Sequence, residues 1–250
     1  RPAMGKCLGR GTKVVMFDGS LKNVEDVQVD DQLMGDDSTP RNVLSTTMGV
    51  EQMYWVRQNK AIDYRVNESH ILSLKRSRTE GPHKNGDVLN INVKEYLDKT
   101  DKFKSNYKGY KVAVEFNKKD LTIDPYFLGL WLGDGSSTKV SIYTQDEEVI
   151  EFLNEYAKKL DLSVREYLQE DKCPEYSITN KKHVDGKTAF SLQKLLRDEN
   201  VLGNKHIPND YLINSEENRL KLLSGLLDSD GYYTHEFNGY EITQKNEELA

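Results

Sequence analysis

Residues 127–135 read Phe-Leu-Gly-Leu-Trp-Leu-Gly-Asp-Gly, and residues 223–231 read Leu-Ser-Gly-Leu-Leu-Asp-Ser-Asp-Gly. In each stretch, leucines surround two small residues four positions apart: Gly129 with Gly133, and Gly225 with Ser229. Residues four apart share one face of a helix, and small ones let a second helix backbone approach that face closely. The two stretches therefore predict a buried pair of helices in one domain.

The similarity extends beyond these two stretches. Residues 142–148 read Ile-Tyr-Thr-Gln-Asp-Glu-Glu, and residues 242–248 read Ile-Thr-Gln-Lys-Asn-Glu-Glu. Each copy thus predicts a helix, an Asp-Gly stop, a strand and the acidic start of another helix. The second copy reaches Ala250 inside that last helix, so we expect the sequence to be part of a longer protein.

Further helix signals place an α/β domain at residues 121–250. Asp124 before Pro125 is typical of an N-cap followed by proline at the first helical position. Residues 147–160 carry apolar side chains at three- and four-residue steps, which predicts an amphipathic helix. Ser215, followed by two glutamates, predicts the start of the helix that contains the second stretch.

Asp134 and Asp230 each take the last helical position before a glycine. A helix C-terminus carries partial negative charge, so a carboxylate there is disfavoured, and two such ends side by side would bring two carboxylates together. Divalent cations would offset this repulsion, since oxygen ligands suit Mg²⁺ and paired metals can clamp a phosphodiester during in-line displacement. Simple helix packing is the alternative, but it leaves the matched aspartates unexplained.

The duplicated motif resembles the LAGLIDADG homing endonucleases, and the second copy matches nearly letter for letter. The resemblance implies an αββαββα pseudo-twofold domain, incomplete in its second repeat, whose strands contact the major groove of double-stranded DNA. It implies that Asp134 and Asp230 bind Mg²⁺ as catalytic acids. Residues 205–208 read Lys-His-Ile-Pro, like a segment before the family's second motif. By resemblance, Lys205 stabilises charge or polarises the attacking water.

The first part of the chain predicts short strands joined by turns. Asp18-Gly19 is a turn dipeptide that follows an apolar run. Alternating or apolar runs predict strands at residues 14–17, 54–56, 64–66, 71–74 and 110–116. We therefore expect a β-rich domain over residues 7–120.

Residues 7–13, Cys-Leu-Gly-Arg-Gly-Thr-Lys, followed by Asp18-Gly19-Ser20, resemble the opening block of an intein. The resemblance implies the N-terminal part of a Hint-type splicing domain, an all-β horseshoe. The Cys7 sulfur would attack the carbonyl before it and convert the Lys6–Cys7 peptide bond to a thioester. A buried free cysteine is the alternative; Cys173 matches no motif.

Inteins assist this attack with a Thr-x-x-His block, and residues 67–70 read Asn-Glu-Ser-His. By resemblance, His70 serves the departing amide nitrogen or the oxyanion. Asn67 replaces the usual threonine, and we expect its side-chain amide to donate a hydrogen bond in its place. A satisfied strand histidine is the alternative for His70.

Residues 1–6, Arg-Pro-Ala-Met-Gly-Lys, resemble part of the phosphate-binding loop of DnaB-like replicative helicases. We expect them to be an N-terminal extein remnant, which makes the flanking exteins of a replicative helicase the splicing partners. The helicase would stay inactive until splicing restores this loop. Inteins end in His-Asn followed by Ser, Thr or Cys, and we expect these residues beyond Ala250.

The net charge of −6 hides an asymmetry. Residues 1–120 carry +4 and residues 121–250 carry −10, and twelve Lys/Arg face six Asp/Glu within residues 71–119. The segment 75–119 is either a solvated, partly looped insertion or a surface that follows DNA phosphates. The candidate DNA-binding residues are Lys75, Arg76, Arg78, Lys102, Lys104 and Lys108.

Composition excludes several classes of protein. The sequence contains no apolar run near the 18 or so residues that span a bilayer, which excludes a membrane protein. It opens without a secretory signal, and two cysteines cannot make a disulfide framework. We expect a cytoplasmic monomer that needs no cofactor for splicing.

Three functions stay open at this stage. The first is an intein that splices and also cleaves DNA with Mg²⁺. The second is a splicing element with a degenerate endonuclease insert. The third is a Hint-type autoprocessing or DNA-binding module that does not splice.

Overall fold

The computed structural model describes residues 7–59, 61–168, 170–180, 191–236, 238–246 and 249. It divides into two compact units, residues 1–114 and 115–250. This division lies a few residues before the boundary expected after residue 120. The expected extein remnant at 1–6 and the glutamates at 247–248 lie outside the described residues. Among the described helices, none has the length and apolar character needed to cross a bilayer.

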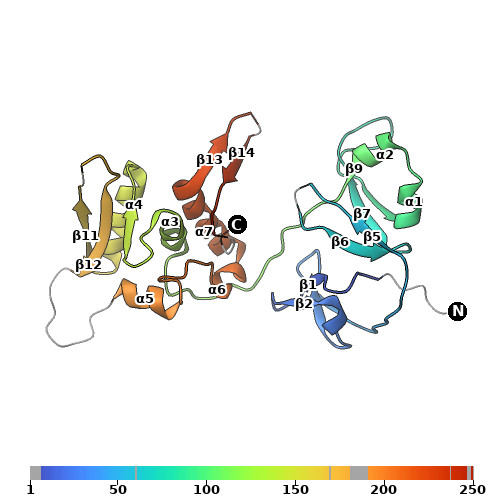
Figure 1. The fold of residues 1–250 in the computed structure, drawn as a ribbon, viewed down its shortest axis with the longest axis horizontal. Coiled ribbons are helices and arrows are strands. Elements are labelled where there is room, and N and C mark those ends of the chain that lie inside the picture. The colour runs from blue at the N-terminus through green and yellow to red at the C-terminus, as the bar shows by residue number, and fades with distance from the viewer. Residues whose placement is uncertain are drawn as a thin grey trace. The chain divides into compact units, whose positions relative to one another are not determined.

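Unit 1 begins with antiparallel hairpins, coloured blue to cyan in Figure 1. The turn of the first hairpin contains Gly19 at a φ of 87°, and the Ser20 amide donates to Asp18 Oδ1 over 2.9 Å. The strands predicted near residues 14–17, 54–56 and 64–66 are confirmed. The pairs are β1 (Lys13–Val15) with β2 (Leu21–Asn23), β3 (Gln32–Met34) with β4 (Pro40–Asn42), and β5 (Met53–Val56) with β6 (Tyr64–Asn67). A 3-10 turn, η1 (Val24–Asp26), follows β2.

The basic segment is a folded part of unit 1. Its central strand β7 (Ile71–Arg76) pairs with β8 (Val88–Asn92) and with β9 (Tyr107–Lys108). Two short helices, α1 (Val93–Leu97) and α2 (Asp101–Asn106), connect β8 to β9. The all-β expectation is therefore corrected: unit 1 is rich in β-strands but contains these helices. Its buried core consists of Val66, Leu72, Leu74, Ile91, Val93 and Tyr107.

The strand predicted at residues 110–116 does not form. From Glu115 onward the chain belongs to unit 2, where side chains bind its backbone groups. The fully buried Asn214 accepts from Lys119 N over 3.1 Å and donates to Lys119 O over 3.2 Å. The Tyr211 hydroxyl accepts from Ile123 N over 3.2 Å and donates to Ile123 O over 2.9 Å. These bonds replace those of a neighbouring strand.

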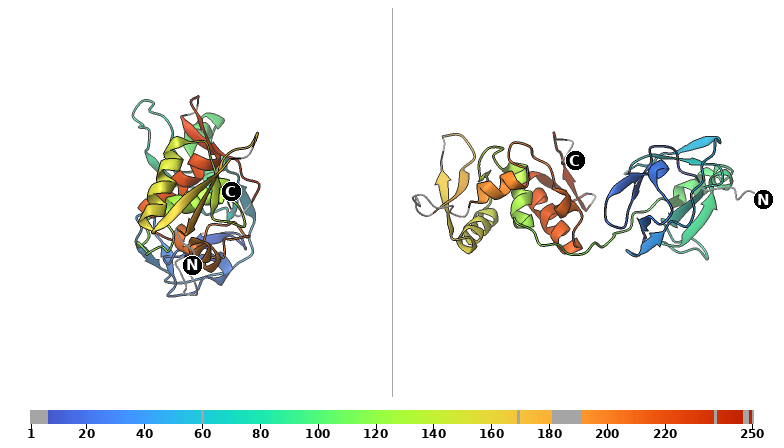
Figure 2. Two further views of the ribbon diagram at one scale, coloured as in Figure 1. Left: turned by 90° about the vertical axis from the view of Figure 1, so that its left-hand side faces the viewer. Right: turned by 90° about the horizontal axis from the view of Figure 1, so that it is seen from below.

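Unit 2 is built around α3 (Pro125–Asp134) and α7 (Glu216–Asp230), which lie side by side in Figures 1 and 2. Asp124 caps α3 by accepting from the amides of residues 126 and 127, and Ser215 caps α7 by accepting from Asn218 N. Both predicted helix starts are therefore confirmed.

A three-stranded antiparallel sheet in unit 2 packs against α4 (Glu147–Lys159), the predicted amphipathic helix. The second copy of the repeat continues from α7 into a hairpin, whereas the first copy has only an isolated bridge between Gly135 and Ile142. The first copy thus lacks one strand of the expected αββ order. The remaining elements are β10 (Ser141–Tyr143), β11 (Leu162–Tyr167), β12 (Glu175–Asn180), α5 (Leu192–Asp198), α6 (Asn209–Leu212), β13 (Gly231–Thr234) and β14 (Gly239–Ile242).

The backbones of α3 and α7 approach each other at Gly129 and Gly225. A Cβ atom at Gly129 would lie 2.2 Å from Leu222 O, and one at Gly225 would lie 2.2 Å from Tyr126 O. Both distances are far shorter than a van der Waals contact, and both would-be neighbours are main-chain atoms. Only glycine therefore fits at these two positions.

Gly129→Ala should destabilise unit 2 by about 1–3 kcal/mol, because the added methyl group forces the helices apart. Urea unfolding monitored by the fluorescence of the fully buried Trp131 measures the change. A Trp55→Phe background leaves Trp131 as the single tryptophan. Ser224→Ala, on the exposed face of α7, is the matched control and should change stability by less than about 0.5 kcal/mol. Equal stability of the two variants would contradict the close packing.

Candidate functional site

Cys7 is held in place by pairing of the first described residues with β6. Leu8 forms an antiparallel bridge with Val66, and Gly9 N donates to Arg65 O over 2.7 Å. A Cβ atom at Gly9 would lie 2.7 Å from Arg65 Cβ, so glycine permits this close pairing. The pairing continues to Asn67, whose amide donates to Cys7 O over 3.2 Å.

The side chain of Asn67 contacts the amide that the splicing reaction would cleave. Asn67 is fully buried, and its Oδ1 accepts from Cys7 N over 2.9 Å. Its Nδ2 donates to Glu51 Oε2 over 2.8 Å and to Ser69 Oγ over 3.0 Å. The expectation that Asn67 donates toward the splice site is therefore wrong: Asn67 accepts there and donates on its other side.

His70 closes the tight turn that begins at Asn67. Its amide donates to Asn67 O over 3.2 Å, and its carbonyl accepts from Val93 N over 3.1 Å. These bonds tie the turn to the start of α1. Cys7, Asn67 and His70 are thus brought to one end of β6, as the sequence predicts for a joint site.

The second group of candidate residues lies where α3 and α7 end. A Cβ atom at Gly133 would lie 3.1 Å from Asp230 Oδ2, so the Asp230 carboxylate reaches the last turn of α3. Gln244 Nε2 donates to the same carboxylate oxygen. Gln244 was not among the residues predicted from the sequence, although the repeated Thr-Gln pair at residues 144–145 and 243–244 marks it.

The electrostatics of this site show that the charges act on one another. Burial raises the pKa of Asp134 above its ordinary value, and the charge of Asp230 raises it further, while Lys205 opposes both effects. Burial lowers the pKa of the Lys205 ammonium, and Asp230 and Asp134 oppose that shift. The three side chains thus form one coupled group of two carboxylates and one cation.

Lys205 also caps α3. Its Nζ donates to Leu132 O and Gly133 O over 3.0 Å each and to Gly135 O over 2.7 Å. These bonds engage all three ammonium hydrogens. Asn246 Nδ2 donates to the carbonyl of Lys205. Lys205 therefore stabilises the negative end of α3, and it is not poised to contact a water molecule.

The donor atoms of this site suit a hard cation. Two carboxylates and nearby backbone carbonyls offer oxygen only, and Mg²⁺ commonly takes one or two carboxylates and keeps water or phosphate oxygens for its other positions. Within the described ranges, the structure has no group of three or more His, Cys, Asp or Glu residues that could hold a metal. The site fits Mg²⁺ only if water or a phosphate completes its coordination.

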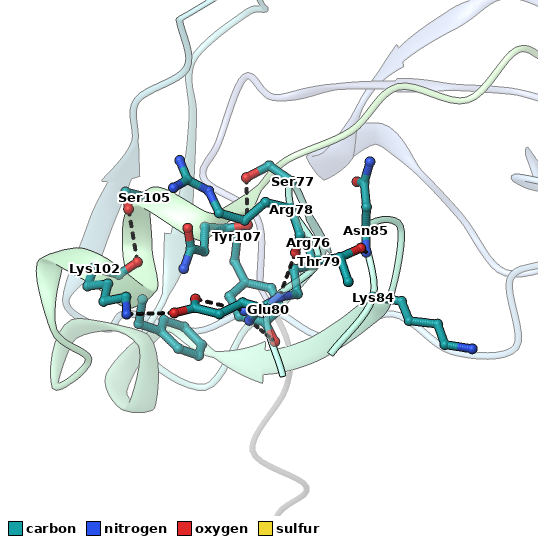
Figure 3. A network of polar contacts seen from close by, with 12 residues as sticks. Arg76, Ser77, Arg78, Thr79, Glu80, Lys84, Asn85, Lys102, Ser105 and Tyr107 are labelled. Atoms are coloured by element: carbon teal, nitrogen blue, oxygen red, sulfur yellow. Dashed lines mark hydrogen bonds and ion pairs between the residues drawn. The ribbon is translucent and has the colours of Figure 1, made fainter. Parts of the chain in front are cut away.

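Arg76, one of the candidate DNA-binding residues, is buried within a polar network (Figure 3). Its Nε donates to Arg78 O over 2.9 Å, and its guanidinium lies 3.4 Å from the Glu80 carboxylate. Lys102 Nζ donates to the same carboxylate over 2.8 Å. Arg76 holds the loop after β7 to the β9 strand, where it also donates to the Tyr107 hydroxyl. It is thus a structural residue here.

The other candidates differ in their surroundings. Lys104 Nζ donates to Leu97 O over 2.8 Å and so links α2 to the end of α1. Lys75 Nζ lies 4.4 Å from the centre of the Tyr110 ring. Arg78 and Lys108 are exposed. The six residues therefore do not form one free basic surface.

Residues 7–123 match the family model described as Hom_end-associated Hint. They form a Hint domain. The chain is also similar to the replicative DNA helicase DnaB of Mycobacterium intracellulare, with 34% identity over 122 residues, 49% of this chain. The V-type proton ATPase catalytic polypeptide of Candida tropicalis is 37% identical over 79 residues, 28% of this chain. The matches span 16% and 7% of the lengths of these two relatives.

The Hint domain match covers Cys7, Asn67 and His70, and it ends within the segment that leads into α3. The Hint domain thus contains one candidate site, and the Asp134–Asp230–Lys205 group lies beyond the matched residues.

Asp134→Asn should stabilise unit 2 at pH 7. The pKa of Asp134 is higher in the folded protein than its ordinary value of 3.8, so the folded state binds the proton more tightly than the unfolded state. Stability therefore falls as the pH rises from about 3.8 through the raised pKa. The amide removes this loss, so the gain should be present at pH 7 and disappear near pH 3.5.

Urea unfolding monitored by Trp131 fluorescence at both pH values checks this prediction. Asp198→Asn, exposed at the end of α5, is the control for removal of one carboxylate. A lower stability of Asp134→Asn than of the unchanged protein at pH 7 would contradict the raised pKa.

Proposed function

We propose that the chain is an intein in which the Hint domain performs protein splicing and unit 2 is a DNA endonuclease. The observation that carries the first part is the hydrogen bond from the Cys7 amide to the buried Asn67 Oδ1. A buried side chain at this amide has no evident use in a protein that leaves the Lys6–Cys7 bond intact. The match to the Hom_end-associated Hint family supports the same proposal.

The chemistry follows from the atoms at the splice site. The Cys7 thiolate attacks the carbonyl carbon of Lys6, the carbon–nitrogen bond breaks, and the departing amine of Cys7 takes up a proton. Asn67 Oδ1 can only accept, so it orients the amide N–H and cannot supply that proton. His70 is the remaining member of the block, and we assign it the role of proton donor.

The endonuclease part of the proposal rests on the matched helix ends. Asp134 and Asp230 would hold Mg²⁺, which would supply Lewis-acid stabilisation of charge on a phosphodiester of double-stranded DNA. Lys205 would keep its bonds to the end of α3 and lower the electrostatic cost of the two carboxylates. We assign phosphate contacts near the Hint domain to the exposed Arg78, Lys102 and Lys108, and a structural role to Arg76.

The host of the proposed intein is a replicative helicase. The similarity to a replicative DNA helicase DnaB supports this assignment, as do residues 1–6, whose sequence ends in Gly-Lys like a phosphate-binding loop.

Thiol treatment should release a tag fused before Arg1 from the unchanged protein and should release none from Cys7→Ala. The reason is that an external thiol intercepts the thioester at Lys6, which only a sulfur at position 7 can form. Electrophoresis and intact mass measure the released tag and the remaining protein. Cys173→Ala is the matched control and should release the tag at the unchanged rate. Release from Cys7→Ala would refute the thioester.

Asp230→Asn should lower the rate of Mg²⁺-dependent cleavage of the uninterrupted helicase gene by about 100-fold or more, since it removes one of the two carboxylates proposed to hold the ion. Conversion of supercoiled plasmid to nicked and linear forms measures the rate. Asp198→Asn should cleave at the unchanged rate. If the unchanged protein cleaves no such plasmid, the alternative of a degenerate endonuclease insert is favoured.

A further inference from the structure

We propose that Glu51 is a positioning residue for the splice site, where it fixes the orientation of the Asn67 side-chain amide. This inference rests on the proposed splicing function and adds a residue that no motif marks. Glu51 lies two residues before β5, and Met53 in β5 pairs with Asn67 in β6. The hairpin thus delivers the Glu51 carboxylate to the side of Asn67 that faces away from Cys7, with Glu51 Oε2 2.8 Å from Asn67 Nδ2.

The orientation of an asparagine amide depends on its partners, because its oxygen and its nitrogen can exchange places by rotation. An ionised carboxylate only accepts hydrogen bonds. Glu51 therefore requires the Nδ2 group on its own side, and the Oδ1 atom must then face Cys7 N. The inverted amide would place two donors, Nδ2 and Cys7 N, against each other at a buried side chain, which is unfavourable.

The need for such a residue follows from the asparagine itself. A threonine hydroxyl at position 67 would rotate freely and could both donate and accept, so it would adapt to the amide without help. An asparagine offers a donor and an acceptor at fixed positions. Glu51 therefore matters with Asn67 and loses its role with threonine, and this dependence separates positioning from a general effect on the fold.

Four side chains at position 51 test the proposal. Glutamine can still accept from Asn67 and should splice at a similar rate. Methionine has a similar size but no comparable acceptor, and Glu51→Met should slow thiol-induced release of the tag by about tenfold. Lysine only donates, so Glu51→Lys should favour the inverted amide and slow release further. The rate is measured at saturating thiol, after circular dichroism confirms that each variant folds.

The same three substitutions in an Asn67→Thr background should change the rate by less than about twofold. An equal loss in both backgrounds would show that Glu51 merely supports the hairpin and would overturn the proposal. Unchanged rates for Glu51→Met and Glu51→Lys in the Asn67 background would overturn it too.

A second measurement does not depend on the reaction. In the unreactive Cys7→Ala protein, hydrogen exchange by NMR reports the protection of the residue 7 amide. Protection should persist in Glu51→Gln and fall about tenfold in Glu51→Met, and equal protection would overturn the proposal. Absence of tag release from the unchanged protein would instead refute the proposed splicing function, and the exchange result would still decide the role of Glu51.

Discussion

The contact between the backbones of α3 and α7 at Gly129 and Gly225 determines the arrangement of unit 2. Once two helices meet this closely, their last turns also meet, and the residues that end them share one small volume. Asp134 and Asp230 are therefore neighbours because of packing several residues earlier. The bonds of Lys205 to the end of α3 and the burial of the leucines around the glycines depend on the same contact.

Much of this arrangement could be predicted because it follows from local patterns. The caps at Asp124 and Ser215 and the apolar spacing of α4 are short-range signals, and the structure confirms them. Small residues four apart in two copies predicted the helix pair, since only another backbone makes use of such a surface. In the Hint domain, Cys7 and the block at residues 67–70 were recognisable by resemblance, and pairing with β6 brings them together.

Predictions from the sequence were wrong where a side chain's partner is distant in the chain. Residues 110–116 alternate like a strand, but alternation does not say whether a neighbouring strand is present. Arg76 counts as a basic residue in composition, yet its charge is used internally by Glu80 and the Arg78 carbonyl. Asn67 was expected to donate because its Glu51 partner, 16 residues earlier, carries no motif. The caps of α1 and α2, Asn92 and Thr100, were readable but overlooked.

The bonds of Asn214 and Tyr211 to residues 119 and 123 decide where the protein can be divided. A separately expressed C-terminal part that starts after residue 120 would keep Asn214 but lose the backbone groups of Lys119 that satisfy it, leaving polar atoms of a fully buried side chain without those partners. A part that starts at Glu115 would retain them. For recombinant work on either half, the segment 115–124 is thus better treated as the first element of unit 2 than as a spacer.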